Sequence, residues 1–290
     1  MASTPPLSST PPLSYCAEEV RRHDRDRFLT ALAAPADKRE ALFALYAFNI
    51  EISKIREIVS ETMLGSIRLQ WWREAIAAIY GEGAIRKHAV AEALHEAVRS
   101  RALSRRHFDV LIDGRELDLE ELPPADIQAL LDYTDATSGA LVLLAMEALA
   151  GALEEAETEA GRAVGRAWAL IGLLRAMPYR LQRGRIDLPA SLAEKHRVDR
   201  RQMLNLKPSP ELAAAAKELA GLARRELSAA RALRRQVRRP ARAALLPAAL
   251  ADGYLRRLAR VDHNVFDRRL ADPPGLASLR LAYRSTIGRY

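Results

Sequence analysis

Apolar residues recur every three to four positions along most of this 290-residue chain, and Pro and Gly separate the successive runs. Such spacing places the apolar side chains on one face of a helix. Within 37–58, for example, Leu45, Ile52 and Ile55 share a face, and Asp37 is a suitable N-cap. No run of useful length alternates apolar and polar residues as a half-buried strand does. The sequence therefore predicts an all-α protein.

The pattern predicts ten or more helices within a single domain that covers residues 15–290. Pro178 is expected to interrupt one of these helices. Residues 183–210 are expected to be a loop within the domain, because apolar helices resume on both sides. Residues 1–14 repeat Thr-Pro-Pro-Leu-Ser and predict a disordered tail. The expected helices are 37–58, 66–80, 89–99, 105–113, 124–134, 138–149, 155–175, 210–237, 241–259 and 275–286.

Much of the formal net charge of +8 comes from residues 221–260, where eleven arginines accompany only Glu226 and Asp252. Two explanations remain open: a solvated helix face, or contact with an anionic membrane surface, where each basic residue contributes about 1 kcal/mol. Nucleic acid binding is not expected, since no binding motif accompanies the charge. No stretch reaches the ~20 apolar residues of a membrane-spanning helix. We therefore expect a cytoplasmic protein, either free or peripheral at the inner face of the cell membrane.

Two segments carry the most specific patterns. Residues 46–57 read YAFNIEISKIRE, and residues 173–189 read LLRAMPYRLQRGRIDLP. They resemble the two aspartate-rich segments of the squalene/phytoene synthase family, whose second segment is close to N-I-x-R-D-V-x-E-D-x-x-R-G-R-I-Y-L-P. Arg175, Arg183 and Arg185 match this second segment without a gap. The resemblance implies an isoprenoid synthase-like helical bundle with a central cavity.

The family's acidic positions are mostly changed in this chain. Paired aspartates four residues apart share a helix face, and two such pairs hold Mg²⁺ against the diphosphate of the substrate. By the resemblance, the first pair falls on Ser53 and Glu57, and the second acidic segment falls on Ala176, Tyr179 and Arg180. One remaining carboxylate does not make a magnesium cluster. We therefore expect no metal, no cofactor and no catalytic residue.

A narrower resemblance concerns the changed positions themselves. The chain reads Phe-Asn-Ile-Glu at 48–51 and Leu-Arg-Ala-Met-Pro-Tyr at 174–179. Both are similar to the branch of the family known from mitochondria as a respiratory complex I assembly factor. This resemblance implies a pseudoenzyme that helps to assemble complex I (NADH:quinone oxidoreductase) by binding a subunit, an assembly intermediate or a lipid-like ligand at the membrane.

Two other functions stay open at this stage. One is an active head-to-head prenyl transferase of isoprenoid biosynthesis, which would need Mg²⁺ and acidic residues from elsewhere in the chain. The other is a metal-independent binder of a prenyl diphosphate or a prenyl lipid. For either ligand, the candidate phosphate or ligand contacts are Tyr46, Lys54, Arg175 and Arg185.

Several other polar or small residues have simpler expected roles. Ser138 and Gly139 are expected to let two helix backbones approach closely, and Tyr133 is assigned to the same packing. Asp113, Glu116 and Asp118 form an acidic group that matches none of the family's metal positions. A solvated face is the expected place for all three carboxylates. Arg185 and Arg183 flank a Gly turn and are expected to brace the loop around it.

Overall fold

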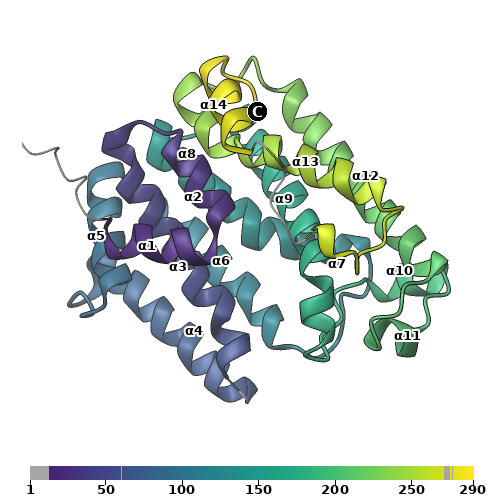
Figure 1. Ribbon diagram of the computed structural model, residues 1–290. Coiled ribbons are helices and arrows are strands. Elements are labelled where there is room, and N and C mark those ends of the chain that lie inside the picture. The colour runs from purple at the N-terminus through teal and green to yellow at the C-terminus, as the bar shows by residue number, and fades with distance from the viewer. Residues whose placement is uncertain (1–12, 60, 271–274, 276) are drawn as a thin grey trace, which may run out of the picture.

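The fold of the chain is all-α, as the apolar spacing predicts (Figure 1). A computed structural model describes residues 13–59, 61–270, 275 and 277–290, and the expected tail 1–14 lies almost wholly outside this part. No strand occurs among the described residues. The α-helices are α1 Tyr15–His23, α2 Arg25–Leu32, α3 Arg39–Ile58, α4 Thr62–Ala77, α5 Ala89–Arg101, α6 Arg105–Glu116, α7 Ile127–Thr134, α8 Ala140–Ala150, α9 Glu155–Leu181, α10 Ala190–Lys195, α11 Arg200–Leu204, α12 Pro210–Ala232, α13 Pro247–Arg260 and α14 Ala277–Thr286.

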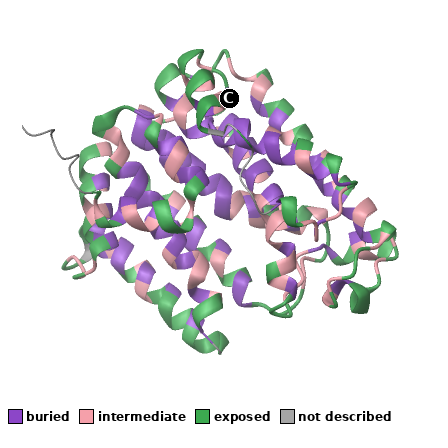
Figure 2. Ribbon diagram, viewed as in Figure 1, coloured by how far each residue is buried: buried purple, intermediate pink, exposed green. Residues whose placement is uncertain are grey.

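Three helices organise the core. Helix α3 packs against α1, α4, α5 and α8, and α9 packs against α8, α12 and α13. Helix α8 lies between these two groups, and every residue from Ala140 to Leu149 is buried. Figure 2 shows the buried residues concentrated in the helices at the middle of the molecule. Burial of this apolar surface is the main stabilising contribution to the fold.

Small residues allow α9 to approach the turn before α8. This turn, η4, covers Asp135–Gly139. A Cβ added at Gly165 of α9 would lie 2.5 Å from the Cα of Gly139 and 2.8 Å from the carbonyl carbon of Ser138. The predicted close approach at Ser138 and Gly139 is thus confirmed, and Gly165 is the partner that the sequence did not identify.

Three local predictions differ from the structure. Asp37 lies in the short helical turn η1 (Ala36–Lys38), and the residue before α3 is Lys38, which makes no side-chain cap. Pro178 does not interrupt its helix, because α9 continues to Leu181. A proline removes one backbone donor, but Met177 and Leu181 beside it are both buried. Their packing keeps the last turn helical. The predicted loop 183–210 also contains α10 and α11.

Replacing Pro178 with alanine is expected to raise the free energy of unfolding by about 1 kcal/mol. Alanine restores the missing donor and removes the clash of the ring with the preceding turn, although it also frees the unfolded chain. Chemical denaturation measures the change. Pro210 provides the matched control, because it occupies the first turn of α12, where proline is favourable. Its replacement by alanine should lower stability slightly. A loss of stability in the Pro178→Ala variant would contradict this account of α9.

Candidate functional site

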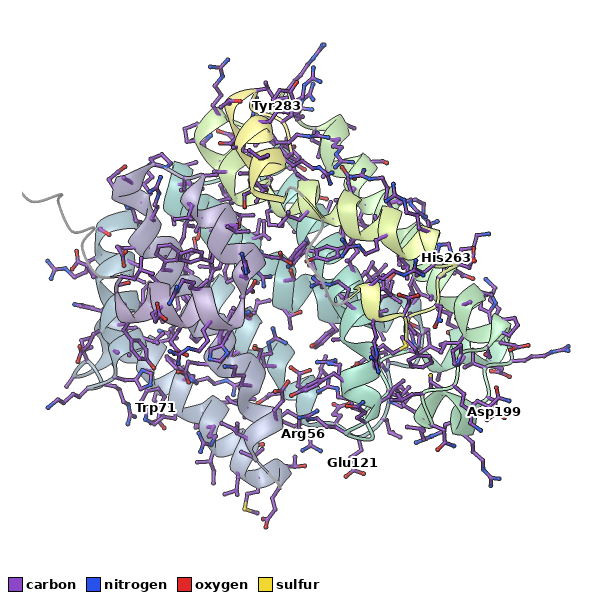
Figure 3. The ribbon with its side chains drawn as sticks, viewed as in Figure 1. Arg56, Trp71, Glu121, Asp199, His263 and Tyr283 are labelled. Atoms are coloured by element: carbon purple, nitrogen blue, oxygen red, sulfur yellow. The ribbon has the colours of Figure 1, made fainter. Side chains whose placement is uncertain are left out.

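The two motif segments meet in one pocket. Ser53 and Glu57 reach it from α3, and Tyr179 and Arg180 reach it from α9. The hydroxyl of Tyr179 donates a hydrogen bond of 3.0 Å to Oε2 of Glu57, which joins the two helices. Figure 3 shows Arg56 and Glu121, which also line this pocket, near each other at the lower side of the view. The structure therefore brings together most of the positions that the resemblance identified.

A buried carboxylate lies behind this pocket. Asp118 is only 3% exposed, although a solvated face was expected for it together with Asp113 and Glu116. Its Oδ1 accepts hydrogen bonds from Tyr133 at 2.8 Å and from Arg185 at 2.5 Å, and its Oδ2 lies 3.1 Å from Nη1 of Arg115. The prediction for Asp118 is wrong because a charge can be buried when it is paired and hydrogen-bonded.

Arginines control the ionisation of Asp118. Burial by itself would raise its pKa, but the guanidinium groups of Arg115, Arg185 and Arg180 outweigh burial and hold the pKa of this carboxyl below its ordinary value. Nη2 of Arg180 lies 3.9 Å from Oδ1. Asp118 is therefore a permanent anion at neutral pH, and its acceptor oxygens are engaged by side chains of the same protein.

A second carboxylate completes this cluster. Asp187 accepts from Nη1 of Arg180 at 2.5 Å and from Nε of Arg185 at 3.0 Å. Arg185 also donates from Nη1 to the backbone carbonyl of Asp118 at 3.0 Å. Arg185 thus braces the loop, as predicted. On the far side, Arg115 donates to Oδ1 of Asn49 in α3 at 3.1 Å. We call Asn49, Arg115, Asp118, Tyr133, Arg180, Arg185 and Asp187 the internal ion network.

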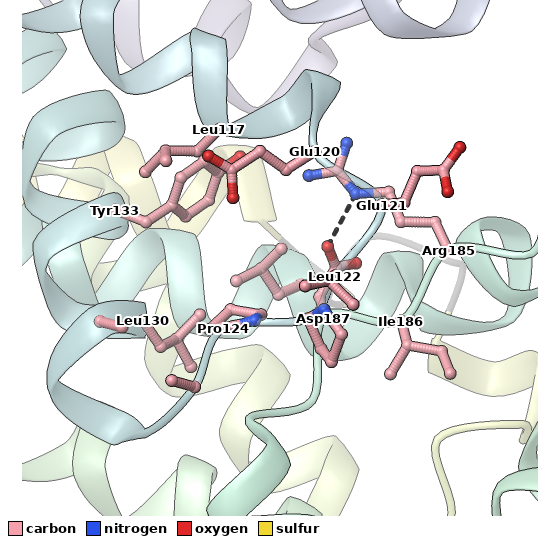
Figure 4. A pocket seen from close by; sticks show the side chains of 14 residues that line it. Leu117, Glu120, Glu121, Leu122, Pro124, Leu130, Tyr133, Arg185, Ile186 and Asp187 are labelled. Carbon is pink, nitrogen blue, oxygen red and sulfur yellow. Dashed lines mark hydrogen bonds and ion pairs between the residues drawn. The ribbon is translucent and has the colours of Figure 1, made fainter.

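An apolar pocket adjoins the network on its other side (Figure 4). Its volume is about 280 Å³, and Leu117, Leu130, Leu173 and Ile186 are among the residues that line it. The dashed line in Figure 4 marks the contact between Arg185 and Asp187 in its wall. Arg185 lines both pockets. The network therefore forms part of the wall between an apolar pocket and a charged one.

Two candidate ligand contacts lie outside the charged pocket, deeper in the bundle. Arg175 pairs with the buried Asp26 at 3.2 Å and stacks 3.6 Å over the ring of Tyr254, whose hydroxyl donates to the same carboxylate at 2.7 Å. Tyr46 is 3% exposed, and burial raises its pKa to about 12. The described contacts give Arg175 a structural partner in α2 and place Tyr46 in the core.

The side chains at the motif positions do not fit a magnesium cluster. Ser53 donates its hydroxyl to the carbonyl of Ile50 at 3.1 Å. Ala176 has no donor atom, and Arg180 is a cation, so Glu57 is the one carboxylate at these positions. Lys54 lies half-buried on α3 and is not among the residues that line this pocket. Mg²⁺ requires oxygen ligands, mainly carboxylates and phosphates, and this set supplies too few.

The acidic half of the network and the partner of Arg175 were not predicted from the sequence. Asp187 lies inside the quoted segment RGRIDLP, and Asp118 lies between two leucines, which is a weak sign of burial. Asp26 carried no signal, because its partner is 149 positions away. In the described part of the chain, no group of three or more His, Cys, Asp or Glu side chains is arranged to hold a metal ion. None of the described helices is long and apolar enough to cross a membrane.

Comparison with known proteins agrees with this geometry. The model of the squalene/phytoene synthase family matches residues 20–274. The Bos taurus protein named NADH dehydrogenase (ubiquinone) complex I, assembly factor 6 is 31% identical over 95% of this chain and 82% of its own length. Presqualene diphosphate synthase of Rhodopseudomonas palustris is 31% identical over 56% of this chain and 57% of its own.

A solved structure of a dehydrosqualene synthase superposes with a TM-score of 0.81 at 18% identity and covers 94% of both chains. This likeness confirms the expected isoprenoid synthase helical fold, in which α3 and α9 present the two motif segments to each other. The family model and the assembly factor relatives both extend over nearly the whole sequence. The chain therefore belongs to the squalene/phytoene synthase family.

Proposed function

We propose that this protein helps to assemble respiratory complex I and does not catalyse prenyl transfer. The observation that carries the proposal is Arg180, a cation at a position where the family places a magnesium-binding carboxylate. Arg180 is ion-paired to Asp187 at 2.5 Å within the internal ion network. The network contains three arginines and two aspartates, a net charge of +1, so a Mg²⁺ ion beside Arg180 would add to an existing excess of positive charge.

The relatives support the same proposal. The match to the proteins named complex I assembly factor 6 extends over 95% of the chain, whereas the match to presqualene diphosphate synthase extends over 56%. Fold alone does not determine function, but the assembly factor relatives match the whole scaffold at similar identity. The partner would be a complex I subunit or an assembly intermediate.

Deletion of the gene in its native host is expected to reduce the NADH:quinone oxidoreductase activity of the membranes severalfold. Native gels should show less of the assembled complex. The wild-type gene should restore both. A variant with Glu57→Gln should restore both equally, because this proposal gives the last carboxylate at the motif positions no catalytic task. Unchanged, fully assembled complex I in the deletion strain would refute the assembly role.

A separate measurement tests whether the protein catalyses prenyl transfer. The purified protein is incubated with Mg²⁺ and labelled farnesyl or geranylgeranyl diphosphate, beside an active enzyme of the family. We expect no released diphosphate and no C30 or C40 product. Turnover by the wild type that is lost in the Glu57→Gln variant would replace our proposal with an active prenyl transferase.

A second candidate rests on the apolar pocket beside Arg185. Its leucine and isoleucine lining suits a prenyl chain, and Arg183 and Arg200 line the charged pocket next to it. The protein would then hold a prenyl diphosphate without turning it over. Binding of farnesyl diphosphate that is equally tight with and without Mg²⁺, and that yields no product, would identify this function.

A further inference from the structure

A basic pocket lies away from the candidate site. It has a volume of about 370 Å³, and its walls are the turn η5 (Arg239–Leu245), the end of α14 with the residues that follow it, and the turn after α2. Figure 3 shows Tyr283 of α14 at the opposite end of the view from Arg56 and Glu121. Arg239, Arg242, Arg284 and Arg289 line the pocket, and none of its lining residues is acidic. Anions are therefore favoured there.

One of the four arginine side chains is hydrogen-bonded within the protein, and the other three are free to bind an anion. Arg242 donates to the backbone carbonyls of Val237, Arg234 and Gly288, at 2.9 to 3.3 Å, and so ties the chain end to η5. The guanidinium groups of Arg239, Arg284 and Arg289 make no ion pair or hydrogen bond within the described part of the chain, although the backbone N–H of Arg289 donates to the carbonyl of Arg284 at 2.9 Å. Guanidinium groups bind phosphate oxygens in pairs. Three such groups around one hollow match a phosphate monoester or diester.

An apolar ridge adjoins this pocket. The side chains of Leu279, Tyr283 and Ile287 are 67%, 64% and 41% exposed. They are four positions apart, so Leu279 and Tyr283 share one face of α14, and Ile287 also lines the pocket. Leu281, on a different face, is 2% exposed and anchors the helix. A soluble phosphate compound would contact the arginines alone and leave the apolar ridge exposed to water. A bilayer surface offers anionic headgroups to the arginines and acyl chains to the ridge.

We propose that the basic pocket and the apolar ridge of α14 form a docking surface for an anionic phospholipid bilayer, with one headgroup phosphate among Arg239, Arg284 and Arg289. This inference goes beyond the assembly role and does not depend on it. It also changes the interpretation of the arginine-rich segment 221–260. Part of that segment is used internally, since Arg231 pairs with Asp252 and Arg238 pairs with the buried Glu157.

The test is co-sedimentation of the full-length protein with vesicles. Wild-type protein should bind vesicles of mixed phosphatidylglycerol and phosphatidylcholine and should not bind pure phosphatidylcholine. A triple variant, R239Q/R284Q/R289Q, should bind the mixed vesicles about 100-fold more weakly, which is about fivefold for each arginine. The matched control, R99Q/R106Q/R225Q, loses the same three charges from exposed positions elsewhere, and its binding should stay within about twofold of wild type.

The ridge is tested separately. A double variant, L279S/Y283S, should bind the mixed vesicles more weakly at every salt concentration, because it removes apolar contact and leaves the charge unchanged. Circular dichroism confirms that each variant is folded. Equal binding by the triple variant and its control would overturn the proposal. So would saturable binding of inorganic phosphate by the wild type without binding to vesicles, because the pocket would then serve a free anion.

Discussion

Replacing Asp118 with asparagine is expected to lower the free energy of unfolding by about 3 to 5 kcal/mol. Asparagine keeps the shape of the side chain and removes its charge, so Arg115 and Arg185 lose their anionic partner in a buried site. Breaking a buried pair by removal of one partner is costly because the remaining charge stays desolvated. Chemical denaturation measures the loss.

Asp113→Asn is the control for this variant. Asp113 also pairs with an arginine, Arg73, but its side chain is 62% exposed, and an exposed pair contributes about 1 kcal/mol or less. If the two variants lose the same stability, the internal ion network does not stabilise the fold.

The effect of Asp118 should also depend on pH. Its pKa in the folded protein is below the ordinary value of 3.8. Such a carboxyl contributes stability above the ordinary value, and this contribution is lost as the pH falls through the folded pKa. The difference in stability between wild type and Asp118→Asn should therefore be full at neutral pH and shrink below about pH 4. A difference that is constant down to acid unfolding would contradict this assignment.

Replacing Gly165 with alanine is expected to cost about 3 kcal/mol. The added Cβ would lie 2.5 and 2.6 Å from the backbone Cα and N of Gly139, and neither atom can move without shifting α9 away from η4. Overpacking against a backbone is more costly than against a flexible side chain. Thermal or chemical unfolding measures the loss, and the helical content should remain.

Gly172 is the control on the same helix. A Cβ at Gly172 meets nothing within 4 Å. Gly172→Ala should therefore raise the free energy of unfolding by about 0.5 to 1 kcal/mol, since alanine favours a helix over glycine. If Gly165→Ala were also stabilising, the close contact between α9 and η4 would not exist in solution.

The helical fold was predictable because it depends on local spacing. Apolar residues three and four apart define a buried face wherever they occur, and the expected ranges overlap ten of the fourteen α-helices in the described part of the chain. No range was expected for α1, α2, α10 or α11. The helix bounds were predicted wrongly where side-chain packing outweighs the conformational preference of a single residue. Pro178 disfavours a helix, but the burial of Met177 and Leu181 on either side keeps α9 intact.

The candidate site was predictable in its positions and not in its contacts. The resemblance assigned Glu57 and Tyr179 to the two motif segments, and the structure joins them by a hydrogen bond. The burial of Asp118 was not predictable, because Arg185, which pairs with it, is 67 positions away in the sequence. Likewise, Arg175 carries the same charge whether it meets a phosphate or Asp26. Only the tertiary structure decides between these two partners.

The internal ion network determines how the buried carboxylates are paired when no ligand is bound to the protein. In a diphosphate enzyme the site keeps an uncompensated charge until metal and substrate arrive, so the resting enzyme is incomplete. Here the counterions of Asp118 and Asp187 are arginines of the same polypeptide, and they are present from the moment of folding. The two aspartates therefore stay paired whether or not anything is bound, and residues on the surface can change while this part of the interior stays stable.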